Sequence, residues 1–532
     1  MTAVERITDR TFDRIALVAV TVLAALVRMP GIDGRGRFDA DQGHDMLTLL
    51  AFTRDGVIPL LGPKTSVGEF HHGAFYYFLL APAAALSNGV PVAVTTFIAL
   101  LGIAAVSLTW WLGRAIGGSL AGAVAGVLLA ASPAAIEEST FIWNPNPIGF
   151  FAILSLAAAW RAHTGGRPAW WTVAVGAAGA VVQLHVLGVV FFLAILFLGL
   201  LELRRRRQIA LGLLGGLGIV LILFLPLIVH ELNTGFLETR RVLDYVSPPD
   251  LGGLNGSINR PSPFDFILAI PFTLIRVIGW PIVGLVTDVP TVAVLVLAVV
   301  IGLVAWGLRA TQGASRTGYR WLVALLAWST LALAFAAPSL QRIVAGLPND
   351  HYHAFLDPVV AILIAVPAAE LFRRASGAWQ STRRPTAAVG LAGVWILLAL
   401  LVAVEVARKP PHVDPDGGWP AARDAGQRIV ATANGAPVVL YGIPDFKLPD
   451  GIGFPIVHAG GTIAPVADLG TGTAVLVIAC DRLFEPTIGL CGGPAEELLV
   501  GNLLAATPDA PRPTIVERFD ASRRTSISIY RP

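Results

Sequence analysis

Long hydrophobic stretches separated by short polar segments fill the chain up to about residue 407 of 532. A membrane-spanning helix needs roughly 20 apolar residues. The pattern therefore predicts spanning helices over 15–31, 91–112, 119–135, 147–160, 169–184, 185–201, 209–229, 291–309, 321–338, 354–372 and 386–407. The apolar run from Trp170 to Leu201 would be about 48 Å long as one helix, too long for one crossing. We therefore expect a tight hairpin there, with Gln183 and His185 at its turn.

Two further apolar stretches are interrupted by residues that do not suit a spanning helix. Residues 74–87 are short and contain Pro82, and residues 264–286 contain Pro271, Arg276 and Pro281. We expect both to form helices that lie in the outer interface without crossing the membrane.

Basic residues indicate the orientation of the spans, because loops on the cytoplasmic side of a membrane protein are enriched in arginine and lysine. Those predicted to be cytoplasmic are Arg114, Arg161, Arg167, Arg204–Arg207, Arg309, Arg316, Arg320, Arg373, Arg374, Arg383 and Arg384. Eleven crossings then leave the N-terminus inside and the C-terminus outside. The long polar segments 32–73, 137–147, 230–262 and 339–353, and everything after residue 408, fall on the outer face, where we expect the function to reside.

From about residue 410 the composition becomes that of a soluble domain. The stretches "PVVLYGI", "AVLVIAC", "PTIVERF" and "TSISIY" are typical of strands, and residues 420–433 and 494–504 of helices. The predicted fold class is an all-α polytopic membrane domain (1–409) with interfacial helices, followed by a small α/β extracytoplasmic domain (410–532). Cys480 and Cys491, the two cysteines of the chain, could form a disulfide in an oxidising compartment or remain two free thiols.

Composition narrows the class of protein. The chain is 55% hydrophobic and 14% charged, and its mean hydropathy of +0.70 is that of a membrane protein. A net charge of +3 gives no support to nucleic-acid binding. The first apolar run ends at Arg28 without a small-residue cleavage site, which favours a retained helix over a removed signal peptide.

Three aspartates directly follow the first span. Asp39, Asp41 and Asp45 lie within seven residues at the start of a predicted helix. A structural interpretation makes Asp41 the N-cap, with Asp45 near the favourable end of the helix dipole. A chemical interpretation makes the acids part of an active site, and the two roles can coexist because a helix start also holds an acid rigidly.

Other polar clusters fall on the same predicted face. Two adjacent histidines, His71 and His72, point to opposite sides of an extended chain, so at most one would face a common site. His351 and His353 alternate along the chain and, with Asp350, could bind a divalent cation or a phosphate; a metal requirement stays open. Arg28 ends a helix, where an arginine commonly reaches towards lipid head groups.

Several of these motifs together resemble the GT-C superfamily of glycosyltransferases. The resemblance covers roughly residues 10–407 and is carried by the acidic motif, "LLGPKTSVGEFHHGAFYYFLLAP", "WNPN", "LPLIVHELNTGF" and "DHYHAFLDP". It is strongest to glycosyltransferase family 39 and its relatives, which include protein O-mannosyltransferases and bacterial aminoarabinose transferases.

The resemblance implies a multi-pass protein of the bacterial plasma membrane that moves a sugar from a polyprenyl-phosphate donor to an acceptor hydroxyl on the outer face. It places Asp41 as the catalytic base and implies inversion at the sugar carbon, with no certain cofactor and a glycan, lipid or protein acceptor. The family often has Asp-Glu where this chain has Asp41-Gln42, so Asp39 or Asp45 would have to take the role of the glutamate in acceptor binding. Candidate donor-phosphate or acceptor contacts are Arg28, Asp39, Gln42, Asp45, His71, Glu138, Asn144, Glu231, Arg240, His351 and His353.

A transporter or flippase of lipids or lipid-linked sugars is the alternative. Such proteins usually place ionisable groups near the bilayer midplane. The spans 91–112, 119–135 and 209–229 contain no acidic or basic residue, and the acids gather at one rim, which favours the enzyme. A membrane-anchored binding module built on residues 410–532 would leave the spans and the acidic loop unexplained.

Overall fold

The structure is a computed structural model that describes residues 3–65, 68–246, 263–284, 290–337, 340, 350–382, 385–444, 449–507 and 511–531. Parts of the predicted outer segments 230–262 and 339–353, and the predicted cytoplasmic pair Arg383 and Arg384, lie outside these residues.

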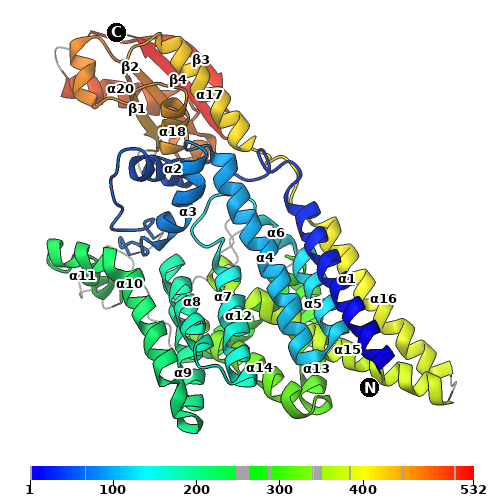
Figure 1. Cartoon of the computed structure of the whole chain (residues 1–532). Coiled ribbons are helices and arrows are strands. Elements are labelled where there is room, and N and C mark those ends of the chain that lie inside the picture. Colours follow the sequence, from blue (N-terminus) through cyan, green and yellow to red (C-terminus); the bar gives the residue numbers. More distant parts are fainter. Residues whose placement is uncertain are drawn as a thin grey trace.

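Helices make up the chain as far as residue 407. They are α1 (Ala3–Arg28), α2 (Ala40–Thr53), α3 (Phe75–Leu86), α4 (Pro91–Gly117), α5 (Ser119–Ala131), α6 (Pro133–Glu137), α7 (Ile148–Gly165), α8 (Trp170–Leu184), α9 (Val189–Arg205), α10 (Ala210–Thr234), α11 (Leu237–Val246), α12 (Pro263–Val283), α13 (Pro290–Ala310), α14 (Gly313–Ala336), α15 (Asp357–Thr382) and α16 (Pro385–Ala407). Figure 1 shows them as one bundle below the C-terminal domain, with α11 projecting to one side and α16 to the other.

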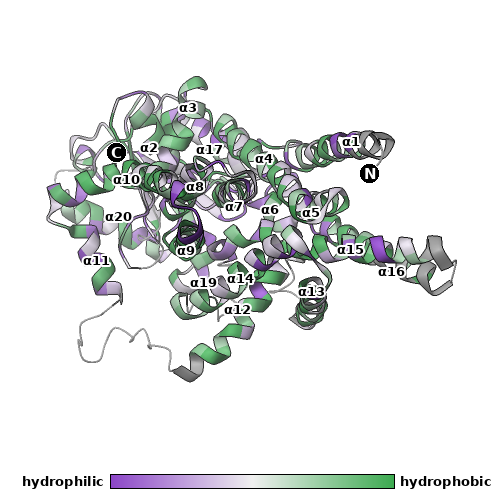
Figure 2. Cartoon of the chain, turned by 60° about the horizontal axis from the view of Figure 1, so that its bottom comes forward, coloured by the Kyte–Doolittle hydropathy of each residue, from purple (hydrophilic) through white to green (hydrophobic). Residues whose placement is uncertain are grey.

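Five stretches among the described residues are long and apolar enough to cross a membrane. They are Pro91–Gly117, Val186–Arg205, Arg207–Thr234, Gly313–Ala336 and Asp350–Ala378. Hydrophobic residues cover most of the bundle helices (Figure 2), and α10 exposes large ones such as Leu211 and Ile222. Side chains of this kind on an outer helix suit a lipid environment. The chain is therefore a multi-pass membrane protein, while the number of crossings and their orientation stay predictions.

The hairpin expected between residues 170 and 201 is present. Helix α8 ends at Leu184, and His185 adopts an extended backbone with φ −155° and ψ 132°. One short 3-10 turn, η1 (Val186–Gly188), follows before α9 begins. The break occurs where the polar Gln183 and His185 interrupt the apolar run.

Both stretches predicted to lie in the interface are helical. Helix α3 continues through Pro82 and packs on α2, and α12 continues through Pro271 and Pro281 against α13, α14 and α6. At 1.5 Å per residue α12 is about 30 Å long, which would also allow a crossing. Its placement in the interface therefore remains a prediction.

The C-terminal domain is a four-stranded sheet covered by helices. The strands β1 (Val438–Ile443), β2 (Val475–Asp481), β3 (Thr514–Asp520) and β4 (Thr525–Arg531) lie in the order β1-β2-β4-β3, and β1 and β2 are parallel. This domain contains the helices α17 (Gly418–Ala433), α18 (Asp450–His458), α19 (Glu485–Ile488) and α20 (Pro494–Ala506). The four predicted strands and the two predicted helices are confirmed.

Strand β2 is buried on both faces because its side chains alternate between two cores. Val475 and Val477 pack with residues of α17 and α18, whereas Leu476 and Ile478 pack with Leu503 of α20. A strand covered on both sides reads as an unbroken apolar run, which is why "AVLVIAC" was recognisable in the sequence.

The disulfide between Cys480 and Cys491 is formed. It joins the end of β2 to the segment before α20. Of the two alternatives that the sequence left open, the structure therefore has the bonded pair.

Candidate active site

Helix α2 brings the three aspartates to the end of the bundle beneath the C-terminal domain (Figure 1). Its N-cap is Asp39, not Asp41 as we expect from the sequence. Asp39 Oδ1 accepts from the backbone N–H of Asp41, and Gln42 Oε1 accepts from the backbone N–H of Asp39 at 3.0 Å. This reciprocal capping box selects Asp39, because only Asp39 has a glutamine three residues later. This spacing of three residues between Asp39 and Gln42 is present in the sequence and indicates the N-cap without any tertiary information.

Asp41 and Asp45 lie in opposite environments on the same helix. The Asp41 side chain is exposed in the first turn of α2. Asp45 is 2% exposed and accepts hydrogen bonds from the hydroxyls of Tyr76, at 3.0 Å, and Tyr77, at 2.9 Å. Burial raises the pKa of Asp45 to about 7, against the opposing effect of these hydrogen bonds. Asp45 therefore joins α2 to α3, and its carboxylate does not face solvent.

Gln42 connects the start of α2 to the loop between α6 and α7. Its Nε2 donates to the carbonyl of Ile142 at 2.9 Å. In the same loop, Asn144 Nδ2 donates to the carbonyl of Leu184 at 2.7 Å. Both predicted contact residues are buried and hold main-chain segments in place.

Aromatic and imidazole rings form a continuous cluster next to this loop. The Trp143 ring lies 4.4 Å from that of His351, which lies 5.4 Å from that of His185. His185 in turn lies 5.0 Å from His72. Burial lowers the pKa of His72 to about 4, so it is neutral at pH 7. His351 and His72 thus belong to one cluster made from four distant parts of the chain.

The cation site suggested by Asp350, His351 and His353 is not supported. The Asp350 carboxylate is bound by Arg276, with Nε at 2.8 Å and Nη2 at 2.7 Å, and lies 3.0 Å from His353 Nε2. His351 packs against Trp143 instead, and no group of three potential ligands is found among the described residues. Arg276 was visible in the sequence as a charge within an apolar stretch, but its partner 74 residues away was not.

Arg28, predicted to contact phosphate, is buried inside the bundle. Its Nε donates to Ser139 Oγ at 2.8 Å, and Nη1 donates to the carbonyl of Ala130 at 3.0 Å. The last carbonyls of a helix such as α5 have no partner within the helix, and a cation there satisfies them. Arg28 therefore connects α1 to the end of α5 and does not extend towards the surface.

His71 and Glu231 contact α11. The His71 Nδ1 lies 3.1 Å from Glu238 Oε2, and Arg241 Nη1 donates to Glu238 Oε1 at 2.7 Å. Glu231 Oε1 accepts from the backbone N–H of Thr239 at 3.0 Å. These contacts attach α11 to α10 and to the loop before α3.

Two further residues predicted to contact substrate, Arg240 and Glu138, belong to different elements, α11 and the end of α6. Arg240 is exposed on α11 and donates to the carbonyl of Thr234 at 3.3 Å. Glu138 ends α6, and burial together with Glu137 raises its pKa to about 8.

The C-terminal domain contacts α2 directly. The His44 Nδ1 lies 2.8 Å from Asp450 Oδ2 at the start of α18, a contact that raises the pKa of His44. Phe38, just before α2, packs against Trp419 and Phe454, at ring-centroid distances of 4.9 and 5.9 Å. The C-terminal domain thus contacts both α2, which carries Asp41, and the residue just before it.

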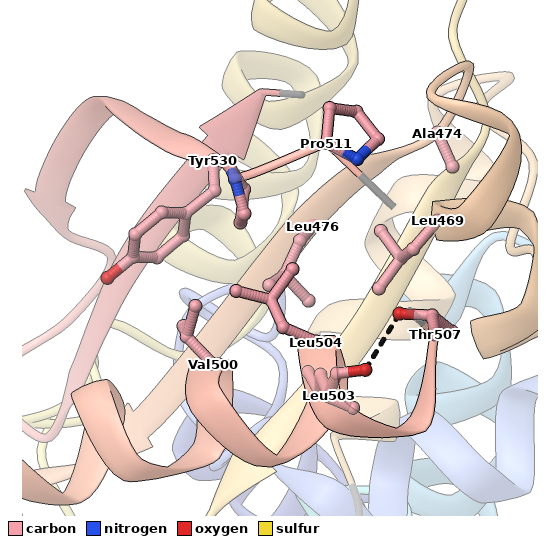
Figure 3. A pocket seen from close by; sticks show the side chains of 10 residues that line it. Leu469, Ala474, Leu476, Val500, Leu503, Leu504, Thr507, Pro511 and Tyr530 are labelled. Carbon is pink, nitrogen blue, oxygen red and sulfur yellow. Dashed lines mark hydrogen bonds between the residues drawn. The ribbon is translucent and has the colours of Figure 1, made fainter. Parts of the chain in front are cut away.

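A small hollow inside the sheet domain offers no comparable chemistry. Figure 3 shows it lined mainly by apolar side chains such as Leu469, Leu476 and Val500, beside α20. The hydrogen bond drawn there, from Thr507 Oγ1 to the carbonyl of Leu503, joins the residue that follows α20 to the last turn of that helix.

Comparisons with known proteins agree with this architecture. Residues 60–233 match the family described as dolichyl-phosphate-mannose-protein mannosyltransferase. No curated protein sequence matches the chain. The fold is similar to ArnT from Cupriavidus metallidurans in the apo state, with a TM-score of 0.55 and 16% identity over 97% of each chain. ArnT bound to undecaprenyl phosphate gives a TM-score of 0.55 and 15% identity, covering 99% of this chain and 98% of that chain. The resemblance to GT-C glycosyltransferases is thereby confirmed.

Proposed function

We propose that this chain, a membrane glycosyltransferase with the GT-C fold, transfers a sugar from a polyprenyl-phosphate donor to an acceptor hydroxyl on the outer face of the membrane, with Asp41 as general base. The donor class is inferred from the undecaprenyl phosphate bound to the ArnT structure that has the same fold. The acceptor is a glycan, lipid or protein bearing a hydroxyl group.

The observation that carries the proposal is the different placement of the three aspartates. Asp39 caps α2, and Asp45 is buried under two tyrosine hydroxyls. Asp41 is the exposed member, and it sits on the first turn of a helix fixed by the capping box, by Gln42 and by the C-terminal domain. A negative charge is favoured at this end of a helix.

The chemistry requires such a group. The acceptor oxygen loses its proton as it attacks the anomeric carbon, and a carboxylate on a rigid element can accept it. The bond from the anomeric carbon to the phosphate oxygen breaks in the same displacement, so the lipid phosphate leaves with the electron pair. Attack from the side opposite the phosphate inverts the sugar carbon.

The decisive experiment uses the full chain in lipid nanodiscs with a panel of undecaprenyl-phosphate sugars, and measures release of undecaprenyl phosphate and sugar transfer. Asp41→Asn should lower the rate by about 100-fold or more, the usual contribution of general base catalysis. The matched control is Asp55→Asn, which removes an exposed carboxylate just beyond the other end of α2 and should leave the rate unchanged. Full activity of Asp41→Asn, or no turnover with any donor of the panel, would contradict the proposal.

A further inference from the structure

A cavity of about 330 Å³ lies where the loop after α1 meets the linker between α16 and α17. Arg35 and Arg37 line it from the loop, Arg408 from the linker, Glu137 from α6 and Trp280 from α12. Its volume is in the range of small-ligand sites. None of its arginines was a candidate in the sequence analysis.

Positive charge is in excess around this cavity. The three arginines face two carboxylates, those of Glu137 and Asp414. Burial raises the pKa of Asp414, which opposes its ionisation. A concave surface with an excess of arginine attracts anions.

Arg35 is fixed in the wall of the cavity and is 3% exposed. Its Nη1 donates to the carbonyl of Val27, and its Nη2 lies 2.6 Å from His412 Nδ1 in the linker. Its Nε is buried without a hydrogen-bond partner among the described residues. A buried guanidinium N–H without an acceptor is costly, so an acceptor supplied by a ligand would be stabilising.

Arg37 is more exposed than Arg35. Its Nη2 donates to Glu137 Oε1 at 3.3 Å, and its guanidinium lies 5.0 Å above the centre of the Phe141 ring. An ion pair with both side chains nearly half exposed contributes little. The aromatic contact orients the guanidinium while leaving its donors able to bind a planar or tetrahedral anion.

We infer that this cavity binds the phosphate group of a substrate through Arg35, Arg37 and Arg408. The inference rests on the proposed function for its place in the reaction, since Arg37 precedes Asp41 by four residues and their Cα atoms are at most about 14 Å apart. The phosphate could be carried by the lipid donor or by a soluble acceptor. The same guanidinium chemistry serves both.

The test measures equilibrium binding to the full chain in nanodiscs of zwitterionic lipid, separately for undecaprenyl phosphate and for glycerol phosphate. Arg37→Gln and Arg408→Gln should each weaken binding about tenfold, the loss expected for one charge-assisted hydrogen bond. Glu137→Gln should have the opposite effect and tighten binding by up to about fivefold, because it removes the competing carboxylate. Arg54→Gln, an exposed arginine at the end of α2, is the matched control. Arg35 is left unchanged because its burial makes a folding defect the expected result of substitution.

Each outcome has a defined meaning. Weakening for undecaprenyl phosphate assigns the site to the lipid carrier, and weakening for glycerol phosphate alone assigns it to a soluble phosphate-bearing acceptor. If neither probe distinguishes Arg37→Gln and Arg408→Gln from Arg54→Gln, the inference is overturned. Because these arms measure equilibrium binding and not turnover, failure of the catalytic role proposed for Asp41 would not be confused with loss of this site.

Discussion

At the scale of single residues, environment gives three neighbouring aspartates three different tasks. The Asp39 carboxylate caps the start of α2, the Asp45 carboxylate accepts hydrogen bonds from two tyrosine hydroxyls, and Asp41 is exposed. The same side-chain chemistry therefore serves as cap, as buried link between α2 and α3, and as the proposed base.

The buried position of Asp45 predicts a pH-dependent stability. Its pKa is about 7 in the folded chain, against about 3.9 in an unfolded chain. Between roughly pH 4 and pH 7 the folded state holds a proton that the unfolded state has released, so stability falls as the pH rises through this window and levels off above it. The difference corresponds to a loss on the order of 4 kcal/mol across the window.

Asp45→Asn should remove this dependence. Thermal unfolding of the chain in nanodiscs, followed by intrinsic fluorescence at several pH values, would show the Tm of the unmodified chain falling relative to that of Asp45→Asn from pH 4 to pH 7. Asp55→Asn serves as the control, because Asp55 is exposed and its pKa is lowered by Arg54. A constant Tm difference between the unmodified chain and Asp45→Asn would contradict the assigned burial.

At the scale of elements, α2 and α18 approach each other closely through two glycines. A Cβ on Gly43 would lie 2.0 Å from the carbonyl oxygen of Asp450, and a Cβ on Gly451 would lie 2.7 Å from the carbonyl carbon of Asp39. The main chains of the two helices therefore touch where the C-terminal domain covers the start of α2. Only glycine permits this approach.

Gly43→Ala should lower both stability and sugar transfer. Alanine normally stabilises a helix interior by about 1 kcal/mol relative to glycine, but here its methyl group would push α18 away from α2. The matched control is Gly302→Ala in α13, where a Cβ would meet nothing within 4 Å and where alanine should be neutral or stabilising. We expect a lower Tm and faster proteolysis of the linker around residues 408–417 for Gly43→Ala alone. A Tm equal to or above that of the unmodified chain would show that the contact is absent.

At the scale of the whole molecule, the proposal depends on which side of the membrane holds α2 and the sheet domain. The pattern of arginine-rich loops predicts that both lie outside the cell. The two native cysteines are paired, so they would not react with maleimide reagents.

Single introduced cysteines would test this orientation. Asp55→Cys, beyond α2, should react with a membrane-impermeant maleimide in intact cells, and Thr164→Cys, exposed at the end of α7, should react only after permeabilisation. The opposite pattern would place Asp41 on the cytoplasmic side and would remove the basis for an outer-face reaction.

Local patterns in the sequence were sufficient for much of the architecture. The break at His185, the strands of the C-terminal sheet and the polytopic class follow from runs of apolar residues and their interruptions, because lipid or a protein core must cover such runs wherever they occur. The identity of the N-cap is also encoded locally, in the spacing from Asp39 to Gln42, so our prediction of Asp41 as N-cap was wrong for a reason that lies within four residues.

The sequence by itself therefore determined the class of protein, the order of its elements and the acidic segment that carries the candidate base. Tertiary structure alone decided that Arg276 pairs with Asp350 and that Arg28 caps α5. It also decided that His72 and His351 share one cluster, and that three arginines line one cavity. The physical reason is distance along the chain. A hydrophobic run or a capping box is complete within a few residues, whereas an ion pair or a binding cavity exists only after segments up to hundreds of residues apart have packed together.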